Sequence, residues 1–274
     1  MASAGPLPTS TMEEIFSSLT FFYFTRFLLL VVVLLVLHVV FRYIQPTLIA
    51  YALNLFSKKY NKDMESFKQE LLKDLESLRE KPTESEEKSA ANGQTTPSLI
   101  VMEIGVGTGA NFKYYPDGTE VVGIEPNPSF ASYLEKNAAV YHPRVRLQRT
   151  VVAYAEDLRG HVDDNSVDAV VSTLVLCTVR DVDAVMKEAK RVLKPGGKFY
   201  FLEHVSAESG TWLLTFQWLV SPVWSYFGEG CQLLRTPWFN VDQARFSKVF
   251  YKKFLASPKL IRLIRPHVMG FATK

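Results

Sequence analysis

The sequence of 274 residues contains little cysteine: only Cys177 and Cys231 occur, and they lie far apart. This spacing matches no metal-binding motif, and two cysteines do not make a disulfide framework, so we expect a reduced compartment. The five histidines form no HxxxH pair and no cluster with cysteine along the chain, so no metal is expected. The net charge is only +3, and no dense Lys/Arg stripe with interleaved aromatics occurs. Nucleic acid is therefore not an expected partner.

A long apolar stretch near the N-terminus stands out instead. Residues 19–41 read LTFFYFTRFLLLVVVLLVLHVVF, where only Arg26 and His38 can carry charge. Roughly 18 apolar residues suffice to cross a bilayer, whereas roughly 10–14 indicate an interfacial segment. The stretch qualifies as a span when Arg26 is included, but the uninterrupted run 27–37 also suits an in-plane or hairpin anchor. Because residues 1–25 lack Lys and Arg while basic residues follow the stretch, the positive-inside rule places the rest of the chain in the cytosol.

The chain divides into three parts by composition. Residues 1–57 form an N-terminal segment that holds the anchor, residues 58–98 an amphipathic helix with a flexible linker, and residues 99–274 the main domain. The helix is predicted to pack on the domain rather than lie on the membrane, because its apolar residues share one face: Met64, Phe67, Leu71, Leu75 and Leu78. The linker, at 81–98, is rich in Ser, Glu, Pro and Gly and is expected to be exposed.

From residue 99 the pattern alternates between strands and helices. Strands are expected at 99–104, 120–125, 144–150, 167–176 and 198–203, with helices at 128–138 and 181–193. The second helix is expected to stop at the turn Lys194-Pro195-Gly196-Gly197. This alternation predicts an α/β fold with a parallel sheet covered on both faces.

A glycine-rich turn follows the first of these strands, in the stretch VMEIGVGTGA. Gly105, Gly107 and Gly109 let the backbone approach a ligand closely, and the spacing up to Ala110 also fits the dinucleotide fingerprint. The loop alone therefore leaves nicotinamide, flavin and S-adenosylmethionine open. Glu103 discriminates among them, because its carboxylate would repel a pyrophosphate but attract the ammonium of S-adenosylmethionine.

Two further carboxylates fit an adenosine ligand. Glu125 ends the next strand in GIEPNP, at the distance from the loop where a carboxylate accepts hydrogen bonds from ribose hydroxyls. Glu156, in AEDL after the third strand, has the position of an acceptor for the adenine amino group. The order of glycine loop, ribose acid, adenine acid, SVDAVVSTLVLCTV and LKPGGKFYFLEH is typical of class I methyltransferases.

The stretches EIGVGTGANFKYYP, GIEPNP, VVAYAEDL, STLVLCTV, RVLKPGGKFYFLEHV, EGC at 229–231 and RPHVMGFATK resemble the membrane-bound thiol methyltransferases, the methyltransferase-like 7 family. The resemblance implies a Rossmann-like doubly wound sheet behind an N-terminal membrane-anchor helix. It implies S-adenosylmethionine as the cofactor and small alkyl thiols or hydrogen sulfide as substrates. It also implies residence on the endoplasmic reticulum membrane and lipid droplets, with the catalytic domain facing the cytosol and the bilayer or droplet surface as partner.

By position, the resemblance assigns cofactor binding to six residues. Glu103 and the three glycines would form the methionine-side pocket, Glu125 the ribose contact and Glu156 the adenine contact. The family usually has Asp at 103 and 125 and Cys at 106, whereas this chain has Glu, Glu and Val106. The acid replacements keep the charge and lengthen the side chain.

Two candidate catalytic residues lie at predicted strand ends. His204, in FLEHV, is a candidate base for the thiol proton, and its alternative is a hydrogen-bonded structural histidine. Cys177 is a candidate to line the pocket, and its alternative is an inert buried thiol. All four tryptophans lie between residues 210 and 240, where either an apolar lid or ordinary core packing would explain them.

Two other functions remain open from the sequence. One is a methyltransferase that acts on a lipid-soluble hydroxyl such as a quinol, since ubiquinone methyltransferases share several motifs. The other is a non-catalytic lipid-droplet membrane protein that keeps the fold as an interaction platform.

Overall fold

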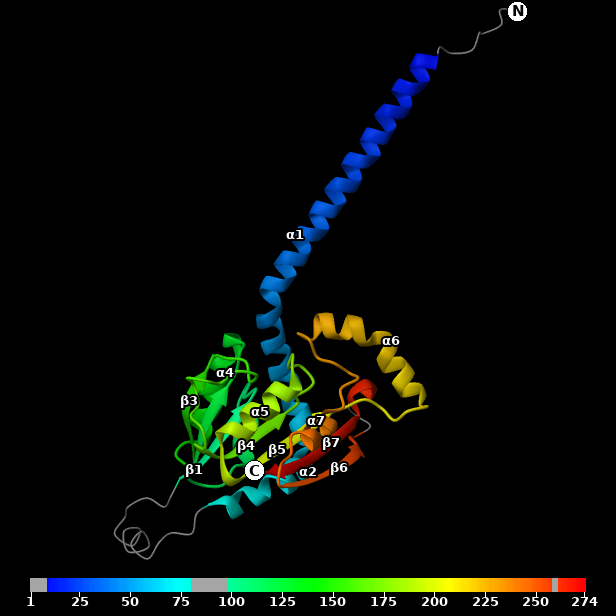
Figure 1. Cartoon of the computed structure of the whole chain (residues 1–274). Helices are drawn as coiled ribbons and strands as arrows, with labels where there is room; N and C mark the ends of the chain where they lie inside the picture. The colour runs from blue at the N-terminus through cyan, green and yellow to red at the C-terminus, as the bar shows by residue number, and fades with distance from the viewer. Residues whose placement is uncertain (1–8, 80–97, 258–260) are drawn as a thin grey trace, which may run out of the picture. The chain divides into compact units, whose positions relative to one another are not determined.

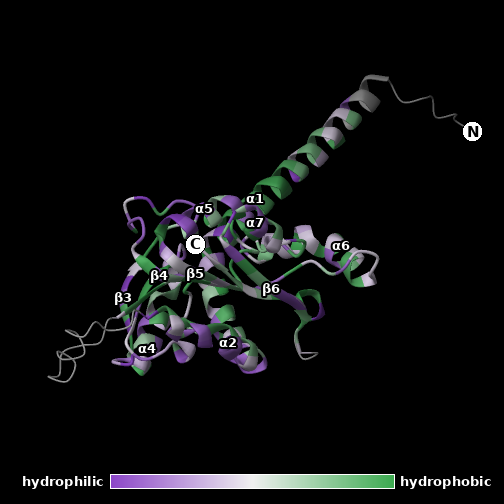
Figure 2. Ribbon diagram, turned by 60° about the horizontal axis from the view of Figure 1, so that its bottom comes forward, coloured by the Kyte–Doolittle hydropathy of each residue, from purple (hydrophilic) through white to green (hydrophobic). Residues whose placement is uncertain are grey.

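The computed structural model describes residues 9–79, 98–257 and 261–274, and the chain divides into two compact units, Met1–Pro46 and Thr47–Lys274 (Figure 1). The first unit is the greater part of one long helix, α1 (Thr9–Asp63). Its large apolar side chains between Phe16 and Ile44 are exposed, and Figure 2 shows the helix as predominantly hydrophobic. By length and composition α1 is able to cross a membrane.

The second unit is built on a mixed seven-stranded sheet with the order β3-β2-β1-β4-β5-β7-β6. Its strands are β1 (Leu99–Ile104), β2 (Thr119–Ile124), β3 (Val145–Val151), β4 (Val167–Thr173), β5 (Leu193–His204), β6 (Lys248–Leu255) and β7 (Pro266–Thr273). The first five strands pair in parallel, whereas β7 runs antiparallel to both β5 and β6.

The prediction of a parallel sheet is confirmed for the five predicted strands, and two further strands extend this sheet at one edge as antiparallel neighbours. The connection between Leu255 and Pro266 is too short for the crossover that a parallel pair requires, so β6 and β7 are antiparallel. The five predicted strands do form, but the fourth ends at Thr173 because Leu174 has the left-handed φ of 58°. The four residues from Leu174 to Cys177 thus leave the sheet as a loop at its carboxyl edge.

Helices cover both faces of the sheet, as the sequence predicted. On one face the core includes residues of α5 (Val182–Val192) and α7 (Pro237–Gln243). On the other face it includes residues of the last turns of α1, of α2 (Glu65–Leu72), of η1 (Lys73–Leu78) and of α4 (Ala131–Tyr141). The predicted helix at 128–138 begins as the single turn η3 (Pro128–Phe130) before α4.

The segment at 60–78 is a core component rather than an appendage. The side chains it contributes are almost fully buried: Tyr60, Met64, Leu71, Leu72 and Leu75. They pack against the same apolar cluster as β1 and β2, so this segment helps to fix the strand ends that carry the site.

Candidate active site

The glycine loop after β1 has the backbone conformation that its glycines allow. Gly105, Gly107 and Gly109 have φ values of 61°, 50° and 71°, which other residues rarely adopt. A Cβ on Gly105 would lie 2.4 Å from Val175 Cγ2, so no side chain fits there. At Gly107 a Cβ would make only ordinary contacts, the nearest at 3.8 Å to Gly105 O, so the positive φ rather than crowding favours glycine there.

Glu125, just after β2, is held against this loop. Its Oε2 accepts a hydrogen bond from Gly107 N at 3.0 Å, and its Oε1 accepts one from Asn127 N at 3.0 Å. Burial raises the pKa of its carboxyl, and the two backbone donors partly offset that rise. The carboxylate therefore has a fixed position beside the loop, with lone pairs left to accept from a ligand.

Glu103 lies one residue before the end of β1 and is buried. Tyr115 Oη donates to Glu103 Oε2 at 2.7 Å, and Asn111 Nδ2 donates to Oε1 at 2.7 Å. Desolvation raises the pKa of Glu103 to about 7, against the opposing effect of these donors. A cation placed beside Glu103 would therefore favour its ionised form.

Lys68 of α2 extends this network from outside the predicted domain. Its Nζ donates to Asn111 Oδ1 and to Asn61 Oδ1, both at 2.7 Å. Burial lowers the pKa of Lys68 to about 8, and the charge of Glu103 opposes that shift. The sequence does not single out Lys68 or Asn111, because Lys68 looks like an ordinary polar residue of an amphipathic helix and Asn111 like an ordinary loop residue after the glycines.

Glu156 lies after β3, and one of its oxygens has a partner. Arg180 N donates to Glu156 Oε1 at 2.7 Å. Its Oε2 is buried and has no hydrogen-bond partner within the described part of the chain. A buried acceptor without a donor is the kind of group that a bound amino group would satisfy.

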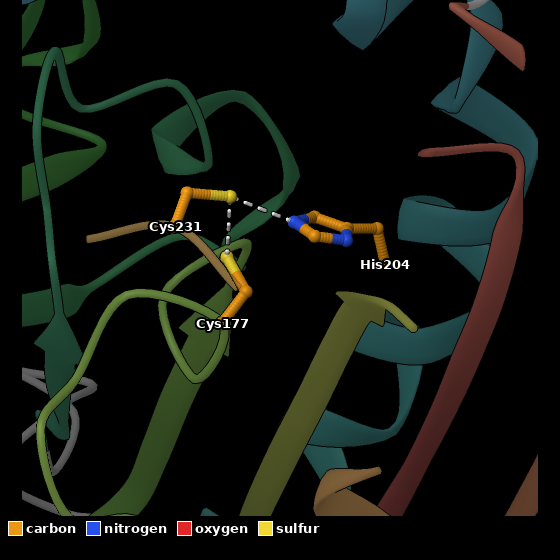
Figure 3. Close-up of side chains that lie close together, drawn as sticks. All are labelled: Cys177, His204 and Cys231. Carbon is orange, nitrogen blue, oxygen red and sulfur yellow. Dashed lines mark hydrogen bonds between the residues drawn. The ribbon is translucent and has the colours of Figure 1, made fainter. Parts of the chain in front are cut away.

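Figure 3 shows that Cys177, His204 and Cys231 lie together at the carboxyl edge of β4 and β5. His204 Nε2 lies 3.2 Å from Cys231 Sγ, and the two sulfurs are 3.7 Å apart. Trp224 Nε1 donates to Cys231 Sγ at 3.3 Å. The loop that holds Cys177 also provides Val175, which packs on Gly105, so the cluster adjoins the glycine loop.

The surroundings of the cluster shift the pKa values of the two cysteines in opposite directions. Hydrogen bonds from Cys177, His204 and Trp224 lower the pKa of Cys231 to about 4, so Cys231 is a thiolate at neutral pH. The pKa of Cys177 is raised well above its ordinary value by its neighbour Cys231 and by burial, so Cys177 stays a thiol. Cys231 therefore brings a negative charge to His204 Nε2.

The other ring nitrogen of His204 has different surroundings. His204 Nδ1 is buried and has no hydrogen-bond partner among the residues that the structure describes. We assign the proton to Nε2, where it donates to the Cys231 thiolate, which leaves a free lone pair on Nδ1.

A second histidine, His267, lies beside His204 on the neighbouring strand. His267 of β7 is paired with His204 in the strand register, and its Nδ1 lies 3.0 Å from Arg265 O. Burial lowers the pKa of His267 to about 4, so it stays neutral, and its Nε2 lies 3.2 Å from Tyr60 Oη of α1. The neighbouring Glu203 has a pKa raised to about 7 by burial. His267 is thus a neutral, hydrogen-bonded structural residue.

The donor atoms of Cys177, His204 and Cys231 all lie within 4.8 Å of one another, which is close enough to hold a soft metal ion such as zinc. The sequence indicates His204 and Cys177 separately but does not predict that they meet Cys231, because the three residues are 27 or more positions apart and lie in different segments of the chain. Cys231 was noticed only within the EGC tripeptide, and that pattern was the one signal that pointed to it.

Comparisons with known proteins agree with this geometry. Residues 102–201 match the methyltransferase-domain family. Two solved structures share the fold at 16% identity and a TM-score of 0.50: the cyclase SpnF, over 65% of this chain and 74% of that one, and phosphoethanolamine N-methyltransferase 2 of Haemonchus contortus with S-adenosylhomocysteine, over 66% and 50%. The domain match and these structures show the fold of a class I methyltransferase.

Curated relatives narrow the class further. Human thiol S-methyltransferase TMT1A is 41% identical over 224 residues, which cover 82% of this chain and 85% of the relative. Human TMT1B is 37% identical, again over 82% and 85%, and rat TMT1B is 36% identical over 83% and 86%. The chain belongs to the thiol S-methyltransferase family.

Proposed function

We propose that this protein transfers a methyl group from S-adenosylmethionine to the sulfur of small alkyl thiols or hydrogen sulfide. The observation that carries the proposal is the His204–Cys231 pair beside the glycine loop, in a chain 41% identical to a thiol S-methyltransferase. When bound, S-adenosylmethionine supplies an electrophilic methyl group, so the protein has only to bind, align and deprotonate the acceptor.

The residues around the loop suit this cofactor. Glu103 would pair with its ammonium, Glu125 with the ribose hydroxyls and Glu156 Oε2 with the adenine amino group. Gly105, Gly107 and Gly109 would let it lie against the backbone of the loop.

His204 is the proposed acceptor of the substrate proton. A free alkyl thiol resembling cysteine has a pKa near 8.5, so only about a few per cent is thiolate at pH 7. The lone pair on His204 Nδ1 takes the proton, and the Cys231 thiolate at Nε2 stabilises the imidazolium that forms. Cys177 touches this pair through its S–H, which makes Cys177 and Cys231 positioning residues rather than nucleophiles.

The proposal includes a location. The apolar α1 anchors the protein to the endoplasmic reticulum membrane and to lipid droplets, with the methyltransferase domain on the cytosolic side. Alkyl thiols that partition into lipid would be concentrated near such a site.

A product screen tests the reaction. The full chain, in vesicles with S-adenosylmethionine, is offered alkyl thiols, sulfide, phenols and a quinol, and the methylated products are identified by mass spectrometry. Methyl thioethers and methanethiol are expected. Methylation of the quinol alone would replace the thiol assignment with the hydroxyl acceptor. Cofactor binding without any product would leave only the non-catalytic platform.

A further inference from the structure

Helix α6 (Trp212–Phe227) exposes apolar side chains and buries a polar one. Its sixteen residues, WLLTFQWLVSPVWSYF, include no Asp, Glu, Lys or Arg. Trp212 and Trp218 are 88% and 67% exposed, and the other exposed large apolar side chains are Phe216, Leu219, Val223, Tyr226 and Phe227. The fully buried side chain of this helix is the polar Gln217.

Gln217 explains how α6 is held with its apolar side outward. Its Oε1 accepts from Ala207 N at 2.7 Å, and its Nε2 donates to Leu263 O at 2.7 Å and to Val205 O at 3.3 Å. A surface helix in water normally buries its apolar face and exposes its polar residues. Here the amide fixes the helix on the protein while the apolar face is left uncovered by the rest of the second unit.

We propose that α6 is a docking surface for the lipid bilayer, with its aromatic and aliphatic side chains inserted at the membrane interface. The inference rests on the membrane attachment through α1 in the proposed function, since that attachment keeps a bilayer near the domain. Trp, Tyr and Phe without charge are the side chains that the interface region accepts best. Scattered apolar residues need no explanation, but a continuous exposed patch marks a contact.

The neighbouring turn fits the same surface. η4 (Arg262–Ile264) is joined to α6 through the Gln217–Leu263 hydrogen bond, and both Ile261 and Arg262 are exposed beside it. An apolar side chain next to a basic one suits the boundary between acyl chains and anionic headgroups.

Docking through α6 would also bring the cluster of Cys177, His204 and Cys231, where the thiol is proposed to bind, close to the membrane. Trp224 of α6 donates to Cys231 Sγ, and the chain passes from the end of the helix to Cys231 in four residues. The surface therefore favours thiols that partition into lipid over strongly hydrophilic ones.

Tryptophan fluorescence tests the docking directly, because α1 contains no tryptophan and the four tryptophans lie at 212, 218, 224 and 238. The full chain is reconstituted in phosphatidylcholine vesicles whose acyl chains are either brominated or not. Brominated chains quench only tryptophans that enter the bilayer. We expect roughly half of the emission to be quenched, since two of the four tryptophans lie on the exposed face.

Three variants make the result specific. Trp212→Phe with Trp218→Phe should abolish most of the quenching, whereas Trp238→Phe, at a buried position, should leave it in place. Leu219→Lys with Val223→Lys should reduce quenching in a protein that still binds S-adenosylmethionine. The proposal is overturned if wild-type emission is not quenched, or if the double Phe variant is quenched as strongly as wild type. None of these readouts depends on methyl transfer, so failure of the thiol assignment would leave them unaffected.

Discussion

The two ring nitrogens of His204 have unlike surroundings, and that asymmetry assigns the direction of proton transfer. Nε2 faces the Cys231 thiolate, whereas Nδ1 is buried without a partner among the described residues. The lone pair on Nδ1 is therefore the one proposed to accept the proton of the substrate thiol.

His204→Ala is therefore expected to lower kcat for alkyl thiols by about 100-fold or less, since a positioned base contributes typically ~10²–10⁴-fold and a thiol needs little help. The loss should fall on the acidic limb of the pH–rate profile. Aryl thiols, already ionised, should be almost unaffected. Rate profiles with both substrates measure this, and His161→Ala, at an exposed position, is the matched control. Equal losses with both thiols would make His204 structural, and loss of wild-type activity on chelation would make it a metal ligand.

Cys231 should react as a thiolate at pH values where an ordinary cysteine is still protonated. With a pKa of about 4, its rate of alkylation by iodoacetamide should be nearly flat from about pH 5.5 to 8, whereas an ordinary thiol with a pKa of about 8.5 reacts roughly tenfold faster per pH unit there. Peptide mass spectrometry should show Cys177 unmodified, because it is buried and protonated. Without the hydrogen bond from the imidazole, His204→Ala should make the Cys231 profile rise with pH. A wild-type profile that rises steeply would contradict the assignment of Cys231 as a thiolate.

Cofactor affinity should increase with pH between about 6 and 8. Glu103 has a pKa of about 7 in the free protein, and an ammonium beside it favours the ionised form, so binding displaces a proton below pH 7. Glu103→Gln should flatten this dependence and weaken binding by about 1.5–3 kcal/mol, as for a charged hydrogen bond. Calorimetric titration in two buffers of different ionisation enthalpy measures both the affinity and the proton. Unchanged affinity in Glu103→Gln would mean that Glu103 does not meet the ligand.

At the same scale, the sequence predicted where Glu103, Gly105 and Glu125 lie better than it predicted the contacts of His204. Glu103 and Gly105 lie at the carboxyl end of β1 and Glu125 follows the neighbouring parallel strand β2, so strand order alone brings them to one edge. Cys231 reaches His204 only because the loop after α6 folds back over the sheet, and no local pattern encodes that contact. Lys68 belongs to a helix whose polar residues all look solvent-exposed from sequence.

Among the elements, the segment from Tyr60 to Leu75 connects the anchor helix to the core. Met64 is fully buried between α1 and α2, and the apolar cluster it joins also holds strands β1 and β2. Met64→Ala should lower the free energy of unfolding by about 2–5 kcal/mol through loss of packing. Chemical denaturation of a chain that begins at Thr47 measures the free energy of unfolding. Lys59→Ala is the control, because Lys59 is similar in size to Met and is exposed. If Met64→Ala lowered the free energy of unfolding by less than Lys59→Ala does, Met64 would not be a core residue.

The helices were easier to predict than the last strands. α5 has a strong amphipathic pattern, and Asp181 at its start accepts hydrogen bonds from Asp183 N and Ala184 N, which is an ordinary N-cap. β6 and β7 lack such signals: β6 is an edge strand rich in lysine, and β7 contains Gly270, a residue that strands disfavour. Their place beside β5 depends on long-range pairing that a local reading does not contain.

For the whole molecule, the distribution of basic residues around the apolar stretch predicts which side of the membrane the domain faces. In intact microsomes, added protease should cut within residues 81–98, of which 81–97 lie outside the described residues, because the basic residues that follow the apolar stretch predict a cytosolic domain. Immunoblotting of the fragments measures the cut, with a lumenal protein as the control for sealed vesicles. Protection of the segment until detergent is added would reverse the orientation.

The outward apolar face of α6 also has a consequence for the protein in water. Removing residues 1–46 would take away the anchor but leave Trp212, Phe216 and Trp218 exposed on the remaining domain. An uncovered patch of this kind is a site of self-association when lipid is absent. Oligomers of an anchor-free chain in plain buffer would then report the missing membrane rather than a native assembly, and a mild detergent or lipid should return such a sample to monomers.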